Sequence, residues 1–378
     1  MTVAHDVHEG LHADEGALPG EHPGRHPQPV VKVHDIAWLE FDKPDLVRTA
    51  AFAVDFGFVP TFATRDELHL RGALPGSPCV IVRRAHRTAF TGVAFRAADD
   101  ADLRTLASEW DRPIESLGDA LGGRAVTTRE PGGCRVRVVA GVTDWPGLPL
   151  QDTRTLNVAR ATGRTNDIQR PARAPAVVER LGHVVLQSTR YLESLNWYLR
   201  NLGLIVSDFL YYPGQRDRGP VMSFVRCDRG AQPSDHHTLA LTLGPADRYV
   251  HSAYQVCDLD ALAAGGEFLT ERGHHRSWGV GRHIQGSQIF DYWRDPDGFL
   301  VEHFTDGDLF DSTVTAGWAP MTASGLNQWG PPATADFLGV APGKAALREF
   351  AAILSSLRES DNEFDVHRLL GLMKVARS

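Results

Sequence analysis

The sequence has few cysteines, no long apolar run and no excess of positive charge. Its four cysteines, Cys79, Cys134, Cys227 and Cys257, form no CxxC pair or other close metal-binding spacing. No stretch approaches the roughly 18 consecutive apolar residues of a membrane span, and the N-terminus has no apolar run typical of a signal peptide. A formal net charge of -8 without a basic block argues against a nucleic-acid partner. We therefore expect a cytoplasmic protein, in a reducing setting, that binds neither membranes nor nucleic acid.

What is present is an ordinary globular composition in a chain that is long for one core. Of the 378 residues, 42% are hydrophobic and 23% are charged, which suits two domains with extensions. The expected divisions are a flexible leader over 1–29, a first domain over 30–142, a linker over 143–176, a second domain over 177–310 and a C-terminal extension with helices over 311–378.

The leader carries scattered histidines among Gly, Pro and acidic residues. Their spacing is irregular and no apolar face accompanies them. A flexible or loosely docked leader therefore explains this segment better than a metal-binding tail does. The histidines are His5, His8, His12, His22 and His26.

The two halves of the chain show the same order of predicted strands and helices. Ala37 precedes Gly57 by 20 residues, and His183 precedes Gly203 by the same number. Each pair begins in a predicted strand and ends at a glycine that closes a predicted helix. This self-similarity predicts an α+β fold of duplicated domains based on a βαβββ unit. The matched segments are 37–57 with 183–203, 92–97 with 251–256, and 130–137 with 295–302.

Three polar residues interrupt apolar, strand-like runs in the second half. His183 lies in LGHVVL, His251 in VHSAYQV and Glu302 in FLVEHF. A polar side chain in such a run is costly unless it is paired or bound to a ligand. A single histidine there is more often a satisfied core residue, but two histidines with a carboxylate are the ligand set of a facial-triad metal site. We therefore predict that these three side chains bind one metal ion.

The first half keeps the frame of this site without its ligands. In the alignment above, the three positions hold Ala37, Gly92 and Arg137. None of these can replace a set of two histidines and a glutamate. The repeat thus predicts a metal site in the second domain and none in the first.

Three further residues could face the same site. His237 precedes His251 by 14 residues, and His283 and Tyr292 lie near the predicted hairpin that ends the domain. From the residues alone, an edge-strand histidine and a packed tyrosine explain them as well as a catalytic role does.

The run from GRH at 281–283 to Glu302 closely resembles the signature of extradiol ring-cleaving dioxygenases. In that pattern a histidine is followed by a tyrosine, an Asp-Pro-x-Gly turn and a metal-binding glutamate, and here the turn is DPDG at 295–298. These enzymes belong to the vicinal oxygen chelate superfamily, with glyoxalases and bleomycin-resistance proteins. The resemblance is specific in the last third of the chain and covers the first domain in pattern only. It implies tandem βαβββ modules forming two vicinal-oxygen-chelate domains, with the metal site in the C-terminal one.

The resemblance also implies an activity and a role for each residue. The chain would be an extradiol dioxygenase of aromatic catabolism that inserts O2, its cosubstrate, into a small catechol-type ring beside the two hydroxyls. It would use Fe(II), or Mn(II) as in some relatives, and would be a homo-oligomer. The implied metal ligands are His183, His251 and Glu302; the implied acid/base residue is His237; the implied pocket residues are His283 and Tyr292.

Two positions depart from the family pattern, and several alternatives stay open. Asp291 stands where an apolar residue is usual, and Val185 stands where some relatives have an asparagine; both bear on substrate rather than on reaction type. A 4-hydroxyphenylpyruvate dioxygenase-like enzyme has the same ligand types, although that family does not require His237, His283 or Tyr292. A non-catalytic protein that binds an aromatic ligand would lack the metal triad. A glyoxalase-type isomerase fits less well, because the site is confined to one domain of a long chain.

Overall fold

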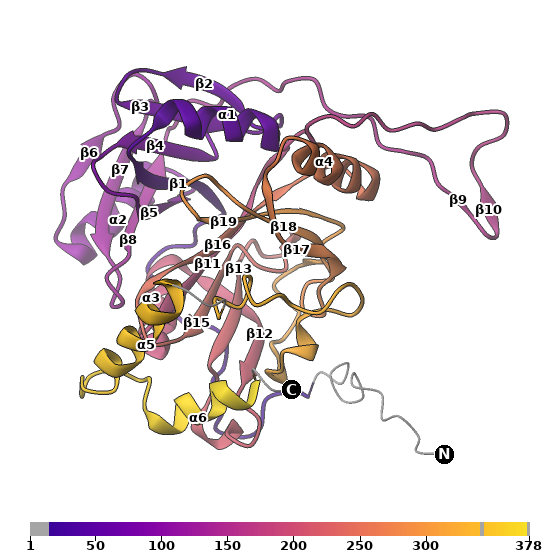
Figure 1. Ribbon diagram of the computed structural model, residues 1–378. Coiled ribbons are helices and arrows are strands. Elements are labelled where there is room, and N and C mark those ends of the chain that lie inside the picture. Colours follow the sequence, from indigo (N-terminus) through magenta and orange to yellow (C-terminus); the bar gives the residue numbers. More distant parts are fainter. Residues whose placement is uncertain (1–14, 341–343, 376–378) are drawn as a thin grey trace, which may run out of the picture.

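The computed structural model describes residues 15–340 and 344–375, and most of its strands form two large mixed sheets (Figure 1). The first sheet has eight strands in the order β2-β3-β4-β1-β5-β8-β7-β6. Its elements are β1 (Asp35–Lys43), α1 (Leu46–Phe56), β2 (Val59–Ala63), β3 (Glu67–Arg71), β4 (Val80–Arg84), β5 (Ala89–Arg96), α2 (Asp100–Trp110), β6 (Ile114–Ser116), β7 (Arg124–Arg129) and β8 (Arg135–Ala140).

The second sheet has nine strands in the order β17-β18-β19-β16-β11-β15-β13-β12-β21. Its elements are β11 (Arg180–Ser188), α3 (Tyr191–Leu202), β12 (Leu204–Tyr211), β13 (Met222–Cys227), β15 (Leu239–Leu243), β16 (Arg248–Gln255), α4 (Leu259–Glu271), β17 (His275–Arg282), β18 (Ile289–Arg294), β19 (Leu300–Thr305) and β21 (Gly317–Pro320). A separate small sheet pairs β14 (Ser234–Asp235) with β20 (Leu309–Phe310).

Each large sheet consists of two βαβββ modules joined through their first strands. In the first sheet β1 pairs antiparallel with β5, and in the second β11 pairs antiparallel with β16. The predicted α+β fold of tandem βαβββ modules is confirmed. None of the helices in the part of the chain that the structure describes is both long and apolar enough to cross a membrane.

The helices begin and end at residues that satisfy their free backbone groups. Asp45 caps α1 by accepting a hydrogen bond from the backbone N–H of Arg48 at 2.9 Å, and Asp258 does the same for α4. Gly57 and Gly203 end α1 and α3 in the left-handed conformation. A side chain at this φ is strained, which explains why glycine follows each helix.

The predicted duplication is confirmed, but the residue count from the glycines places strand β1 one residue out of register with strand β11. Trp38 lies across from Ala94 on β5, as His183 lies across from Ala253 on β16. The residue at the position of His183 is therefore Trp38, not Ala37. The slip arises because α3 has 12 residues and α1 has 11, so counting back from the closing glycines misplaces the strand.

The other two matched positions hold in the strand pairing. Ala94 pairs with Arg137, as Ala253 pairs with Glu302. Gly92 lies across from β1 at the point that corresponds to His251. The counterparts of the three predicted ligands are thus Trp38, Gly92 and Arg137.

The DPDG turn joins the two sheets. Asp295 accepts a hydrogen bond from Lys43 of β1, and Asp297 accepts one from Arg48 of α1 at 2.6 Å. Lys43 and both aspartates are buried. His303 of β19 adds a bond from Nε2 to the backbone oxygen of Phe56 at 2.8 Å. The turn therefore carries a structural role that its common sequence did not indicate.

The described part of the leader, residues 15–29, lies against the second domain. Arg216 forms ion pairs with Glu15 and, at 2.8 Å, with Glu21, and the N–H of Trp318 donates to the oxygen of Glu15. Ion pairs with Arg216 therefore connect the acidic side chains of this part to the second domain. The leader histidines outside the described residues are His5, His8 and His12.

The polar linker includes a small two-stranded arm, β9 (Asn157–Val158) and β10 (Ala161–Thr162), which projects from the body of the molecule (Figure 1). The C-terminal extension packs on the second domain. Its strand β21 adds to the edge of the second sheet, α5 (Lys344–Ser356) pairs Glu349 with Arg248, and Asp365, just before α6 (Val366–Val375), pairs with Arg218. The domain boundaries proposed from sequence stay predictions.

Candidate metal centre

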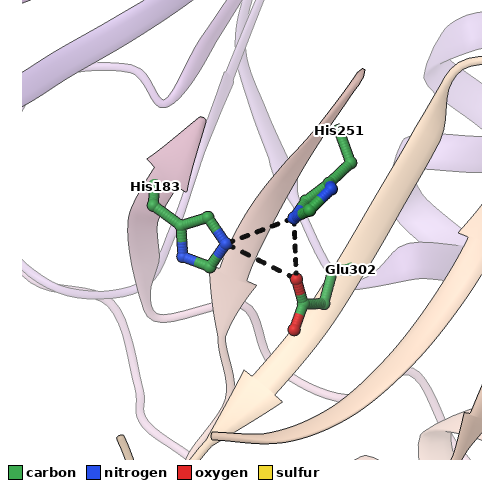
Figure 2. Close-up of side chains that lie close together, drawn as sticks. All are labelled: His183, His251 and Glu302. Atoms are coloured by element: carbon green, nitrogen blue, oxygen red, sulfur yellow. Dashed lines mark hydrogen bonds and ion pairs between the residues drawn. The ribbon is translucent and has the colours of Figure 1, made fainter. Parts of the chain in front are cut away.

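Three neighbouring strands at the centre of the second sheet bring His183, His251 and Glu302 together (Figure 2). His183 on β11 and Glu302 on β19 lie on either side of Ala253, which occupies the strand between them. His251 is two residues before Ala253 on β16, so strand alternation places it on the same face. The small side chain of Ala253 leaves room for the three larger ones to converge.

The ligand atoms are close enough to share one ion. His183 Nε2 and His251 Nε2 lie 3.4 Å apart, and Glu302 Oε2 lies 3.5 Å from the first and 3.3 Å from the second. All three residues are buried, and Glu302 has no exposed surface. Neither carboxylate oxygen of Glu302 has a hydrogen-bond partner among the described residues.

The electrostatics of the site favour a neutral His183 beside an ionised Glu302. Burial lowers the pKa of His183 and outweighs the opposing effect of Glu302. Burial acts to raise the pKa of Glu302, but the adjacent His183 and His251 lower this pKa by a larger amount. The net shift is therefore downward. The site thus holds an anion with no permanent protein cation in contact, which is the condition that a bound metal ion relieves.

The two ligand rings are oriented by packing. Their Nδ1 atoms are buried and have no hydrogen-bond partner among the described protein atoms. The His183 ring lies against Phe304, with centroids 5.7 Å apart, and the His251 ring meets Tyr292 edge-on at 5.1 Å.

His237 lies beside His183, with ring centroids 4.0 Å apart. It is buried, and burial lowers its pKa well below the ordinary value for histidine. Its Nδ1 atom forms a hydrogen bond of 3.0 Å with Nδ1 of His236, whose Nε2 in turn bonds Asp208 Oδ2 at 2.6 Å. The adjacent His236 and His237 were the available sequence signal for this hydrogen-bonded series, whereas no sequence pattern pointed to Asp208.

His283 and Tyr292 form a polar pair next to Glu302. His283 Nδ1 bonds the backbone oxygen of Leu326 at 2.7 Å, and its Nε2 bonds the Tyr292 hydroxyl at 2.9 Å. Because burial lowers the pKa of His283, the ring is neutral, so its Nδ1–H donates to Leu326 and its Nε2 accepts from Tyr292. Tyr292 is paired directly with Glu302 across the sheet, and His283 Nε2 lies 3.8 Å from Glu302 Oε1.

A segment from the C-terminal extension covers this side of the site. Leu326 and Phe337 pack against Trp278, Phe290 and Tyr292. Trp278 donates from Nε1 to the backbone oxygen of Pro331 at 2.8 Å, which fixes the segment in place. These apolar walls were not predicted, because nothing in the sequence links residues 324–337 to the hairpin.

The two departures from the family pattern lie in different places. Val185 lies directly across from His251 and on the face of His183, so it borders the site. Asp291 alternates away from Tyr292 and contacts Arg276 at 3.1 Å on the side covered by α4. The expectation that Asp291 bears on substrate is therefore wrong, because its side chain faces the helix rather than the site.

The fold is shared with solved structures that include an extradiol dioxygenase and a glyoxalase, and the candidate metal centre lies in the C-terminal part of the chain as expected. Homoprotocatechuate 2,3-dioxygenase from Arthrobacter globiformis superposes with a TM-score of 0.67 at 18% identity, over 82% of this chain and 92% of that one. A Mn(II)-bound glyoxalase from Novosphingobium aromaticivorans superposes with a TM-score of 0.66 at 23% identity, over 81% and 94%.

In sequence, the chain is similar to metapyrocatechase 2 from Cupriavidus necator, with 33% identity over 153 residues. The match covers 40% of this chain and 44% of the length of that relative. No protein-family model matches the sequence. Because a glyoxalase shares this fold over four fifths of the chain, the length of the chain does not exclude a glyoxalase-type activity.

Proposed function

We propose that this protein is an extradiol dioxygenase that cleaves a catechol-type aromatic ring beside its two hydroxyls, with O2 as cosubstrate. The observation that carries the proposal is the buried Glu302 carboxylate, which lies within 3.5 Å of the imidazoles of His183 and His251 and has no hydrogen-bond partner among the described residues. Two imidazoles and one carboxylate on one face are the ligand set of metal centres that leave positions open for substrate and dioxygen. The likeness to metapyrocatechase 2 and to homoprotocatechuate 2,3-dioxygenase supports this reaction over other uses of the triad.

His183, His251 and Glu302 would hold Fe(II), or Mn(II). When bound, the ion supplies positive charge that lowers the pKa of a catechol hydroxyl and an open position for dioxygen. The three protein ligands carry a total charge of -1, so the site retains a net positive charge that an anionic catecholate can balance.

The surrounding side chains would position the ring and move its protons. Tyr292 donates its proton to His283, so the tyrosine oxygen can accept a hydrogen bond from a catechol hydroxyl. His237, buried and neutral beside His183, would act as the acid/base residue during oxygen attack and ring opening. Phe290, Trp278 and Phe337 form an apolar wall that would exclude water.

The test is anaerobic reconstitution with Fe(II), followed by addition of catechols and air. We expect oxygen uptake together with a yellow ring-fission product. Absence of uptake across a broad catechol panel, with one metal ion per chain demonstrably bound, would contradict the proposal. Parallel loading with Mn(II) decides which ion supports turnover.

A glyoxalase-type reaction is the second candidate, favoured by the likeness to the Mn(II)-bound glyoxalase. It needs no dioxygen. Turnover of a thiol adduct of an α-oxoaldehyde under strict anaerobiosis would support it, whereas turnover that requires oxygen supports the dioxygenase.

A further inference from the structure

The buried chain from Asp208 through His236 to His237 determines which nitrogen of His237 carries a proton. We propose that Asp208 and His236 are positioning residues that hold His237 in the tautomer with its proton on Nδ1 and a free lone pair on Nε2. This inference rests on the proposed function for its catalytic meaning, and on the hydrogen bonds alone for the tautomer.

The direction of the hydrogen bonds follows from the acceptor at the end of the chain. An ionised carboxylate can only accept, so the 2.6 Å bond between Asp208 Oδ2 and His236 Nε2 requires a proton on Nε2. When His236 carries that single proton, its other nitrogen, Nδ1, is an acceptor. In this state the donor of the 3.0 Å contact between the two Nδ1 atoms is His237. His237 keeps its Nε2 unprotonated, which is the state of a general base.

Backbone hydrogen bonds and ring contacts fix the orientation of the His236 side chain. Its backbone N–H donates to the oxygen of Asp308 at 2.9 Å, and its backbone oxygen accepts from the Ser207 hydroxyl at 2.5 Å. Phe224 and Phe310 flank its ring, with centroids 5.5 and 5.4 Å away. Gly286 passes so close that an added Cβ would lie 2.9 Å from His236 Nδ1. A ring flip would break the bonds at both nitrogens, so the order Asp208–His236–His237 is fixed by the fold.

The chain also reaches the surface of the molecule. Asp208 and His236 line a surface cavity of about 350 Å³, whereas His237 is buried beside His183. The hydrogen bonds thus connect the buried ring of His237, through His236, to the Asp208 carboxylate at this cavity.

The test combines a tautomer measurement with kinetics. The full chain, labelled with ¹⁵N in its histidine rings and free of metal, gives two-bond proton–nitrogen spectra; His236→Gln and His237→Gln assign the signals. We expect His237 to show a protonated Nδ1 and an unprotonated Nε2. In Asp208→Asn the amide can donate to His236, which reverses the chain, and His237 should then carry its proton on Nε2 in a detectable fraction of molecules.

Kinetics of the Fe(II)-loaded chain complete the experiment. We expect Asp208→Asn to lower kcat about 10²-fold at unchanged KM and metal content, and Asp208→Glu to restore part of the loss. Asp308→Asn is the matched control, because Asp308 lines the same cavity but its side chain bonds Ser287 rather than a histidine ring. The spectrum and the kcat of this variant should equal those of the wild type.

A wild-type His237 protonated on Nε2, or an Asp208→Asn spectrum identical to the wild type, overturns the inference. A wild type that turns over no catechol contradicts the proposed function alone, since the tautomer is read independently.

Discussion

The centres of the two sheets differ in how a buried carboxylate is balanced. In the first sheet Glu40 of β1 lies within 2.9 Å of Arg83, Arg135 and Arg137, and it also accepts a hydrogen bond from Trp38 Nε1. In the second sheet the ionic contacts of Glu302 with the described residues are to histidines, which are charged only if protonated. The carboxylate of Glu40 is thus balanced by arginine side chains, whereas the carboxylate of Glu302 has no permanently charged side chain among its ionic partners in the described part of the chain.

The same strand positions serve both arrangements. Arg137 occupies the place of Glu302, so a positive side chain stands where the second sheet has a negative one. Gly92 occupies the place of His251, and an added Cβ there would lie 2.8 Å from the Arg135 backbone oxygen and 3.1 Å from its side chain. The loss of a histidine side chain thus makes room for a guanidinium. The two copies of the frame therefore have similar strand pairing but place a candidate metal site in one and an ion-pair cluster in the other.

The largest expected effect comes from removing the unbalanced carboxylate. Glu302→Ala should reduce bound Fe(II) or Mn(II) from about one ion per chain to none and abolish ring cleavage, because the triad loses its only anion. Metal analysis after desalting measures this. Full metal content in Glu302→Ala would break the contrast between the two centres.

Tyr292→Phe should lower kcat by about 10-fold to 10²-fold without loss of metal, because it removes one oriented hydroxyl beside the ligands. The matched control is Thr127→Val. Thr127 pairs with Arg137 across the first sheet as Tyr292 pairs with Glu302 in the second, and its hydroxyl accepts from Arg137 at 3.3 Å. Turnover assays should show no change in the control; equal effects in both variants would argue against a role for Tyr292 in the reaction.

Glu40→Gln tests the ion-pair cluster of the first sheet. It should lower the free energy of unfolding of the first domain by about 2 kcal/mol, since it removes the buried anion that pairs with three partly exposed arginines. Calorimetry should show a lower Tm, while metal analysis should show full occupancy. Loss of metal with Glu40→Gln would mean that the first centre contributes to the site.

The smallest effect is expected at Asp291, whose counterpart in the first sheet is the apolar Val126. Burial raises the pKa of Asp291 to about 7, although Arg276 lowers it. A raised pKa means that the folded state binds the proton more tightly between pH 4 and 7, so stability falls as pH rises through that range. Asp291→Asn should remove this loss, which unfolding titrations at pH 4.5 and 8 would measure. An unchanged difference between the two pH values would show that Asp291 is ionised throughout.

Much of the fold followed from local sequence. Gly57 and Gly203 predicted helix ends, and the apolar runs around His183, His251 and Glu302 predicted strands. The predicted ligands could be recognised because a polar residue within an apolar strand is rare without a partner.

The arrangement across the sheets could not be read in the same way. Counting residues from Gly57 placed Ala37 at the position that strand pairing gives to Trp38, because the helices differ in length by one residue. Counting residues identifies equivalent positions in two repeats only when the elements between them have equal lengths. The backbone hydrogen bonds between strands identify the equivalent positions directly.

By itself, the sequence determined the duplicated α+β frame and the three side chains that converge in its second copy, since both depend on periodicity and local composition. Only the tertiary structure decided what lies around them. Asp208 is 29 residues from His237, and Lys43 is 252 residues from Asp295, so no local pattern links either pair. Their contacts exist because packed sheets bring distant strands together, and burial then requires each charge and each hydrogen-bonding group to find a partner.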